Sequence, residues 1–189
     1  MQSSHRGFLT AAVAVLIGGC ASTTVTGTWK SPAVETMGMH KVLAIAYVPT
    51  ESVRRNLEDR LIRELAEDGV VAVPSYRLVE STDSLDKNTI RGLVRDGQFD
   101  SVLVANYIGT THDIDYVPLT TYYDYFGYWS SPGMVDETTV VKLEFRLFDA
   151  RENGRMVWSA TTSTFDPGEG AVPEVADKIV ARLEDDRNR

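Results

Sequence analysis

The sequence predicts an α/β fold with a single mixed sheet, parallel in its first half and an antiparallel hairpin in its second half. Two observations support this prediction. Apolar runs and amphipathic segments alternate over residues 41–108, which is typical of parallel strands joined by helical crossovers. Residues 139–149 then alternate strictly between apolar and polar side chains, as in a strand with one face in water. The expected order is β-α-β-α-β, an aromatic loop, and then β-β-α.

Three strands are expected in the parallel half. Residues 41–48 form a nearly continuous apolar run that Pro49 ends, which is typical of a strand buried on both faces. Residues 70–73 are a second, short strand, and residues 101–108 are a third. The short spacings between the three favour parallel pairing.

Two helices are expected between these strands. Thr50 can cap a helix over residues 51–68, and a shorter helix follows over residues 88–96. In the longer helix, pairs four residues apart such as Arg54 and Glu58 are predicted to form a solvated outer face. The apolar stripe facing the sheet is expected to consist of Val53, Leu57, Leu61, Ile62 and Leu65.

The second half begins with the alternating strand over residues 139–149. A turn at residues 152–154 (ENG) leads into a partner strand over residues 155–164, because Asn and Gly tolerate positive φ. Pro173 can start a last helix, and the charged tail after Glu184 is expected to fray. The inward side chains are expected to be Val141, Leu143, Phe145, Leu147, Met156, Trp158, Ala160, Val175, Ile179 and Leu183.

The amino terminus is predicted to be a signal peptide over residues 1–19. Arg6 gives it a positive charge, and residues 7–17 are an apolar run too short to span a bilayer. Residues 16–20 (LIGGC) resemble the bacterial lipobox, which implies cleavage between Gly19 and Cys20 and acylation of Cys20. Two or more acyl chains would anchor the protein durably to a membrane.

The lipobox also implies a location and a domain boundary. Under the enteric sorting rule, Ala21 in place of Asp implies the periplasmic face of the outer membrane, with the inner membrane as the less favoured alternative. Residues 20–28 are expected to be the lipidated cysteine and a flexible linker. One α/β domain should then cover residues 29–186, and residues 187–189 should be a tail.

The composition of the chain argues against some classes of binding partner. The chain has 189 residues, 43% hydrophobic and 24% charged, and can therefore bury a core. Its net charge of −8, without a cluster of Lys and Arg, argues against a nucleic-acid partner. The membrane is therefore expected to be bound through acyl chains on Cys20 and not through protein charge.

Few residues suggest a catalytic or metal-binding function. After processing, His40 and His112 are the only histidines. A cation could be gathered by His112 with Asp113, Asp115 and Asp124, but their spacing matches no metal-binding loop, and a solvated polar loop is the favoured interpretation. The prediction is therefore no metal site, no cofactor and no catalytic residues.

The most unusual segment is an aromatic loop within residues 112–137. Amphipathic rings offer a large contact area at low entropy cost and can stack on sugars. Three roles are open: a contact surface for an envelope protein or peptidoglycan, a loop at the membrane interface, and a structural flap over a sheet edge. The candidate binding residues are Tyr116, Tyr122, Tyr123, Tyr125, Phe126, Tyr128 and Trp129.

Several short motifs carry a resemblance to known proteins. They are the opening TWKSP at residues 28–32, VPSY at 73–76, FDSVLV at 99–104, the tyrosine-rich loop, LFD at 147–149 and VWS at 157–159. With these motifs, the sequence resembles a family of bacterial envelope lipoproteins described as domains of unknown function. Its order of elements is also similar to penicillin-binding-protein activators, curli-secretion pore subunits and the amino-terminal domain of TolB. The resemblance implies an α/β fold in the envelope and brings no catalytic residues.

Together these observations predict a lipid-anchored, non-catalytic binding or scaffold module of the cell envelope. One alternative is an envelope hydrolase acting on peptidoglycan or glycan, for which carboxylates such as Glu80 and Asp83 would be needed as a pair. A second alternative is a subunit of a secretion or envelope assembly.

Overall fold

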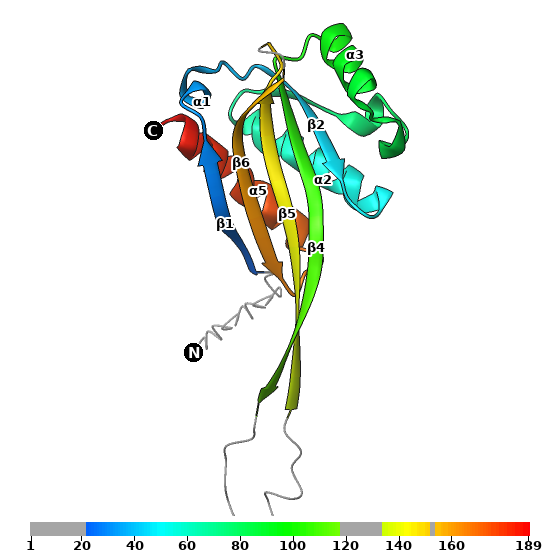
Figure 1. Cartoon of the computed structure of the whole chain (residues 1–189), viewed down its shortest axis with the longest axis vertical. Helices are drawn as coiled ribbons and strands as arrows, with labels where there is room; N and C mark the ends of the chain where they lie inside the picture. The colour runs from blue at the N-terminus through cyan, green and yellow to red at the C-terminus, as the bar shows by residue number, and fades with distance from the viewer. Residues whose placement is uncertain (1–21, 118–133, 152–153) are drawn as a thin grey trace, which may run out of the picture.

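A six-stranded sheet forms the centre of the molecule (Figure 1). The computed structural model describes residues 22–117, 134–151 and 154–189. Its strands are β1 (Ser22–Lys30), β2 (Lys41–Tyr47), β3 (Val71–Pro74), β4 (Ser101–Val117), β5 (Met134–Asp149) and β6 (Arg155–Phe165). They lie in the order β1-β6-β5-β4-β2-β3. β2 is parallel to both β3 and β4, and the other pairs are antiparallel, so the predicted mixed sheet is confirmed.

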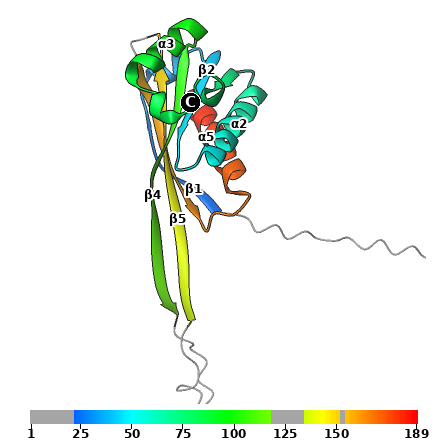
Figure 2. The same cartoon turned by 90° about the vertical axis from the view of Figure 1, so that its right-hand side faces the viewer.

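Helices cover both faces of this sheet. They are α1 (Ala33–Thr36), α2 (Glu51–Glu67), α3 (Lys87–Gly97) and α5 (Ala171–Arg187), with two 3-10 turns, η1 (Ser75–Arg77) and η2 (Thr82–Ser84). Figure 2 shows α2 and α5 on one face, with α3 at the upper end of the other. Within the described residues, no helix is long and apolar enough to cross a membrane.

The parallel half follows the predicted order. Thr50 is the N-cap of α2, as expected, because its side chain accepts a hydrogen bond of 3.4 Å from the Val53 amide. The chain runs from β2 through α2 to β3 on one side, and then through α3 to β4 on the other side of β2. The carboxyl end of β2 is therefore a topological switch point, the place where open α/β sheets bind ligands.

The antiparallel half has the predicted inward faces except at Met156. A bulge between Leu147 and Phe148 places Met156 opposite Phe148, and Val157 is buried in its stead next to Trp158. On β5, Phe145 and Leu147 are fully buried, and on β6 Trp158 and Ala160 are buried beside them. These four side chains belong to a large core beneath α2 and α5. Gly154 has a φ of 73°, consistent with the predicted turn.

The predicted flexible linker is corrected by the structure. Residues 22–28 belong to β1, an edge strand that pairs with β6 from Ser22 opposite Phe165 to Lys30 opposite Trp158. Thr and Val favour strands, but an edge strand with one face in water shows little apolar patterning, so no pattern in the sequence indicated β1. The sheet therefore begins at Ser22, two positions after Cys20.

The predicted aromatic loop over residues 112–137 is also corrected. β4 continues to Val117 and β5 starts at Met134, so both ends of that segment are strand. From His112 opposite Thr139 to Val117 opposite Met134, the two strands pair only with each other among the described residues. Figures 1 and 2 show this two-stranded ribbon projecting from the body of the molecule.

The last helix is longer than expected. The tail after Glu184 was predicted to fray, but α5 continues to Arg187. Asp186 is buried there and accepts a hydrogen bond of 3.0 Å from Nε1 of Trp158. A contact with the core therefore orders residues whose sequence is charged and polar.

Candidate ligand-binding groove

A groove of about 950 Å³ lies between α3 and the sheet face opposite α2 and α5. Its volume is within the range of about 300 to 1,000 Å³ that is typical of small-molecule sites. The groove reaches the carboxyl end of β2, where Tyr47 lies opposite Asn106 of β4. It therefore extends to the topological switch point.

The floor of the groove is apolar. Val102 and Val104 of β4 and Phe148 of β5 contribute the sheet side, and Ile90 and Val94 of α3 contribute the helix side. The helix side chains pack against a second, smaller core that includes Leu43, Ile45 and Phe99. An apolar part of a ligand would be in contact with these side chains.

Local contacts fix the ends of α3. The Asp86 side chain accepts a hydrogen bond from the Thr89 amide at 2.7 Å, and this bond lowers the pKa of Asp86. The helix ends at Gly97, and the next residue, Gln98, is its C-cap and is left-handed with a φ of 53°. The predicted helix over 88–96 is thus confirmed, with one more residue at each end.

Four cationic side chains line the groove. Lys87, Arg91 and Arg95 are spaced four residues apart, so they lie on one side of α3, and Arg146 reaches the groove from β5. Arg95 is paired with Asp96 at 2.8 Å and Arg146 with Glu144 at 2.8 Å. Within the described ranges, Lys87 and Arg91 form no ion pair, and no lining residue is a carboxylate.

Tyr47 supplies a polar group at the switch point. Its hydroxyl donates a hydrogen bond of 3.1 Å to the backbone oxygen of Leu85. Burial raises the pKa of this phenol, although nearby Arg54 acts in the opposite direction. Tyr47 is therefore a neutral group that ties β2 to the segment before α3.

A buried ion pair behind the groove overturns a prediction from the sequence. Arg54 and Glu58 were expected on the solvated face of α2, but their side chains are 1% and 0% exposed and lie 3.2 Å apart. Burial is possible because η1 folds back over α2: Ser75 contacts both charged groups, at 2.9 Å from Arg54 Nη2 and 2.7 Å from Glu58 Oε1. On the same helix Val53, expected to be buried, is 40% exposed.

This network positions the chain that leads to α3. Arg54 donates to the backbone oxygens of Val79 and Glu80 at 3.3 and 3.4 Å. Glu58 accepts from the amide of Ala46 on β2 at 2.9 Å. Strand β2, helix α2 and the segment before α3 are therefore held together by one pair of buried charges.

Most of the site residues predicted from the sequence lie outside the described residues. These include the cleavage site at Gly19, the lipidation site at Cys20, and the rings at Tyr122, Tyr123, Tyr125, Phe126, Tyr128 and Trp129. Tyr116 is part of β4, where it lies opposite Val135.

The possible cation-binding cluster considered from the sequence lies on the two-stranded ribbon. His112, Asp113 and Asp115 are consecutive or alternate positions of β4, and Asp124 lies outside the described residues. Nδ1 of His112 is 3.3 Å from the Thr139 hydroxyl. Across the described part of the chain, no group of three or more His, Cys, Asp or Glu side chains is placed to hold a metal.

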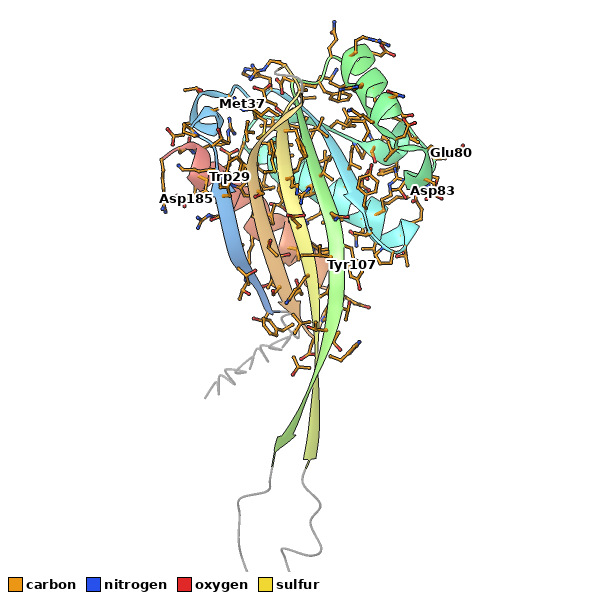
Figure 3. The ribbon with its side chains drawn as sticks, viewed as in Figure 1. Trp29, Met37, Glu80, Asp83, Tyr107 and Asp185 are labelled. Atoms are coloured by element: carbon orange, nitrogen blue, oxygen red, sulfur yellow. The ribbon has the colours of Figure 1, made fainter. Side chains whose placement is uncertain are left out.

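The carboxylates considered for hydrolysis do not line the groove. Glu80 and Asp83 are both exposed and lie at the margin of the molecule, as Figure 3 shows. The groove itself was not predicted from the sequence. The one signal of the groove in the sequence was the four-residue spacing of Lys87, Arg91 and Arg95. This spacing indicates a site only when a sheet face lies opposite that side of the helix.

The fold and the groove define a class of protein: a small α/β domain with a concave, cation-rimmed groove at a topological switch point. No protein-family model matches the sequence, and no curated protein sequence matches it. The sequence is therefore not assigned to a family.

Several solved structures are similar to this chain, and three of them are described here. PelC from Paraburkholderia phytofirmans, a dodecamer, is 20% identical, with 86% of this chain and 94% of that chain covered and a TM-score of 0.47. Lipoprotein GNA1162 from Neisseria meningitidis is 17% identical, with 77% and 99% covered and a TM-score of 0.47. A minor lipoprotein from Acinetobacter baumannii is 12% identical, with 79% and 95% covered and a TM-score of 0.32.

Proposed function

We propose that this protein is a lipid-anchored, non-catalytic binding module of the cell envelope, and that its groove beneath α3 binds an amphipathic anion. Acyl chains on Cys20 would hold it on the periplasmic face of the outer membrane. The observation that carries the proposal is the lining of the groove. Four cations surround an apolar floor, with no carboxylate among the described lining residues, in a chain whose net charge is −8.

The chemistry of the lining indicates the ligand class. Arg91 and Lys87 have no described ionic partner, so they can pair with a carboxylate, sulfate or phosphate without first breaking an ion pair. The arginine guanidinium suits such anions because its planar donors match two oxygens at once. The apolar floor favours a ligand that also has a hydrocarbon or aromatic part.

The same lining disfavours the hydrolase alternative. Glycoside hydrolysis uses two carboxyl groups on either side of the scissile bond. The described lining of the groove offers cations, Tyr47 and Asn106 in place of such a pair. A binding function therefore has the better support.

Binding of 8-anilinonaphthalene-1-sulfonate, an aromatic anion, tests the groove directly. We expect saturable fluorescence enhancement with the mature chain, weakened at least tenfold by Arg91→Glu. Arg63→Glu is the matched control, because Arg63 is exposed on the outer side of α2 and far from the groove lining. Equal weakening by both variants would indicate a general charge effect and would count against the site.

We also propose that the aromatic segment is a contact surface for an envelope protein or peptidoglycan. The ribbon supports this because β4 and β5 leave the body of the sheet before residue 118. Alanine at Tyr122, Tyr125, Tyr128 and Trp129 is expected to weaken pull-down of envelope partners at unchanged thermal stability. Crosslinking in cells from a photoreactive group at Tyr125 would identify the partner. If the alanine variant lost thermal stability but still recovered partners, the segment would instead be a structural flap over a sheet edge.

Membership of a secretion or envelope assembly remains the second candidate. PelC, which is similar in structure, is a dodecamer, and an assembly role for this chain would require rings of subunits. Light scattering of the delipidated domain distinguishes the candidates, because a monomer would contradict a ring.

A further inference from the structure

A second cavity, of about 390 Å³, lies on the other face of the sheet, between the first turns of α2 and α5. Its lining side chains are mainly apolar. Val53 and Leu57 come from α2, Val172 and Val175 from α5, and Leu143 from β5. No charged residue of the described chain lines it.

The polar groups in this apolar pocket already have partners. The Tyr107 hydroxyl and Thr110 Oγ1 are 2.8 Å apart and can hydrogen bond to each other. Thr164 Oγ1 is 3.0 Å from Thr23 Oγ1 on β1. Because these groups satisfy one another, a hydrocarbon occupant would leave few polar atoms unpaired, which is the condition for burying an apolar ligand.

The pocket opens where apolar side chains remain uncovered. Val53 continues the apolar stripe of α2, yet 40% of it is exposed. Val172 is partly buried at the start of α5, and Pro49 and Pro167 are exposed beside it. The mouth therefore presents an apolar surface to water.

The start of β1 lies against a wall of the same pocket. Ser22 pairs with Phe165, next to the lining residue Thr164. The Thr23 amide donates to Glu174 Oε1 at 3.0 Å, and Lys178 Nζ donates to the Thr23 backbone oxygen, so β1 is tied to α5 at this end. Figure 1 shows the start of β1 and the end of β6 at the same end of the sheet.

Cys20 is only two positions before Ser22. A residue spans at most about 3.6 Å, so the backbone of Cys20 is within about 7 Å of Ser22. A long acyl chain attached to Cys20 can therefore reach the pocket without any rearrangement of the sheet.

We propose that this apolar pocket binds one of the acyl chains attached to Cys20. The proposal rests on the proposed lipidation of Cys20. When the protein lies on a membrane, its acyl chains are in the bilayer. The pocket would be occupied when the protein is away from a membrane, because exposing methylene groups to water is unfavourable.

The first experiment uses the mature chain, residues 20–189, with Cys20→Ser, and titrates it with the methyl ester of cis-parinaric acid. This fluorescent ester is uncharged, so it lacks the anionic group that the cationic groove is proposed to bind. We expect saturable binding at one site, weakened at least tenfold by Val53→Asp. Leu78→Asp is the matched control, since Leu78 is 44% exposed and does not line the pocket.

Circular dichroism of each variant checks its folding, and Val172→Phe, which would fill the pocket, is the second variant if Val53→Asp misfolds. Absence of binding, or equal binding by wild type and the pocket variants, would overturn the proposal. Incorporation of labelled palmitate at Cys20 tests lipidation separately. A lipidated chain without ester binding would disprove the pocket alone, and an unlipidated chain would disprove the anchor.

The second experiment identifies the source of the acyl chain. Cells are grown with a diazirine-bearing palmitate, and the purified lipoprotein is diluted out of detergent and irradiated. We expect crosslinks from Cys20 to peptides containing Val53 or Val172, lost in Val53→Asp and retained in Leu78→Asp. Crosslinks from free phospholipid alone would overturn the assignment of the pocket to the protein's own anchor.

Discussion

Nε1 of Trp158 donates a hydrogen bond of 3.0 Å to Oδ2 of Asp186, and both residues are buried. Arg182 donates to the same carboxylate oxygen at 2.9 Å. Trp158 belongs to β6, and Asp186 belongs to the last turn of α5. This contact therefore secures the carboxyl end of α5 on the sheet.

Asp186 should contribute to stability in a pH-dependent way. Burial raises the pKa of Asp186, but the hydrogen bonds from Trp158 and Arg182 lower it by a larger amount. The pKa is therefore below its ordinary value. The stabilisation is therefore present above the unfolded-state pKa of about 3.9 and is lost as pH falls through the folded-state pKa. Urea unfolding monitored by tryptophan fluorescence should show a flatter acid dependence for Asp186→Asn than for wild type.

At neutral pH, Asp186→Ala should cost about 1 to 3 kcal/mol, because it leaves a buried indole N–H without its acceptor. Asp185→Ala is the control, since its ion pair with Arg189 is on the surface. Equal effects of the two substitutions would contradict the importance of the buried bond.

The buried pair of Arg54 and Glu58 should show strong coupling. Removing one partner leaves the other charge buried and unpaired, so Arg54→Met should lower the free energy of unfolding by about 3 to 5 kcal/mol. The double variant with Glu58→Leu should cost less than the sum of the single variants by about 1 kcal/mol or more. A double-mutant cycle from urea unfolding measures this coupling, and strictly additive costs would refute it. Arg55→Met, at an exposed position, should change stability little.

Gln98 and Asp166 should respond differently to replacement by glycine. Both have positive φ, at 53° and 44°, which glycine adopts without strain. Gln98→Gly should stabilise by up to about 1 kcal/mol, because relief of the left-handed strain at the end of α3, about 1 to 2 kcal/mol, exceeds the cost of the extra unfolded-state entropy of glycine. Asp166→Gly should bring no such gain, since it removes the bond of 2.8 Å that the Asp166 carboxylate accepts from the Thr139 amide. Thermal unfolding of both variants tests the difference.

The ribbon should open more readily than the rest of the sheet. Residues 112–117 of β4 pair only with β5 among the described residues, whereas residues 101–106 pair with β2 and β5. Isolated two-stranded hairpins are marginally stable in water. Hydrogen exchange should therefore be faster in residues 112–117 than in residues 101–106. Equal protection in a monomeric sample would contradict this expectation.

Cys20→Ser should separate folding from attachment. Exported with a cleavable signal of the non-lipoprotein type, the variant is expected to fold and to remain soluble in the periplasmic fraction. Sedimentation of the washed membranes measures attachment. If the processed variant still sedimented with membranes, the aromatic segment would be a second anchor.

Local patterns in the sequence were sufficient for the elements of the sheet and their order. The apolar run at 41–48 and the alternation at 139–149 report how each strand is buried, because a strand places successive side chains on opposite faces. Thr50 and the stripe through Leu57, Leu61 and Leu65 predicted α2, since capping and helical periodicity involve only neighbouring residues. The candidate lipid anchor at Cys20 was likewise visible as a local motif.

The tertiary structure decided what no local pattern contains. Arg54 and Glu58 look like an ordinary surface pair in the sequence, and they are buried only because η1, some twenty residues away, folds over them. The groove exists because α3 lies across a distant sheet face, and the apolar pocket exists because α2 and α5 leave Val53 uncovered. Burial and cavities depend on which distant segments meet, so they follow from packing and not from residue order.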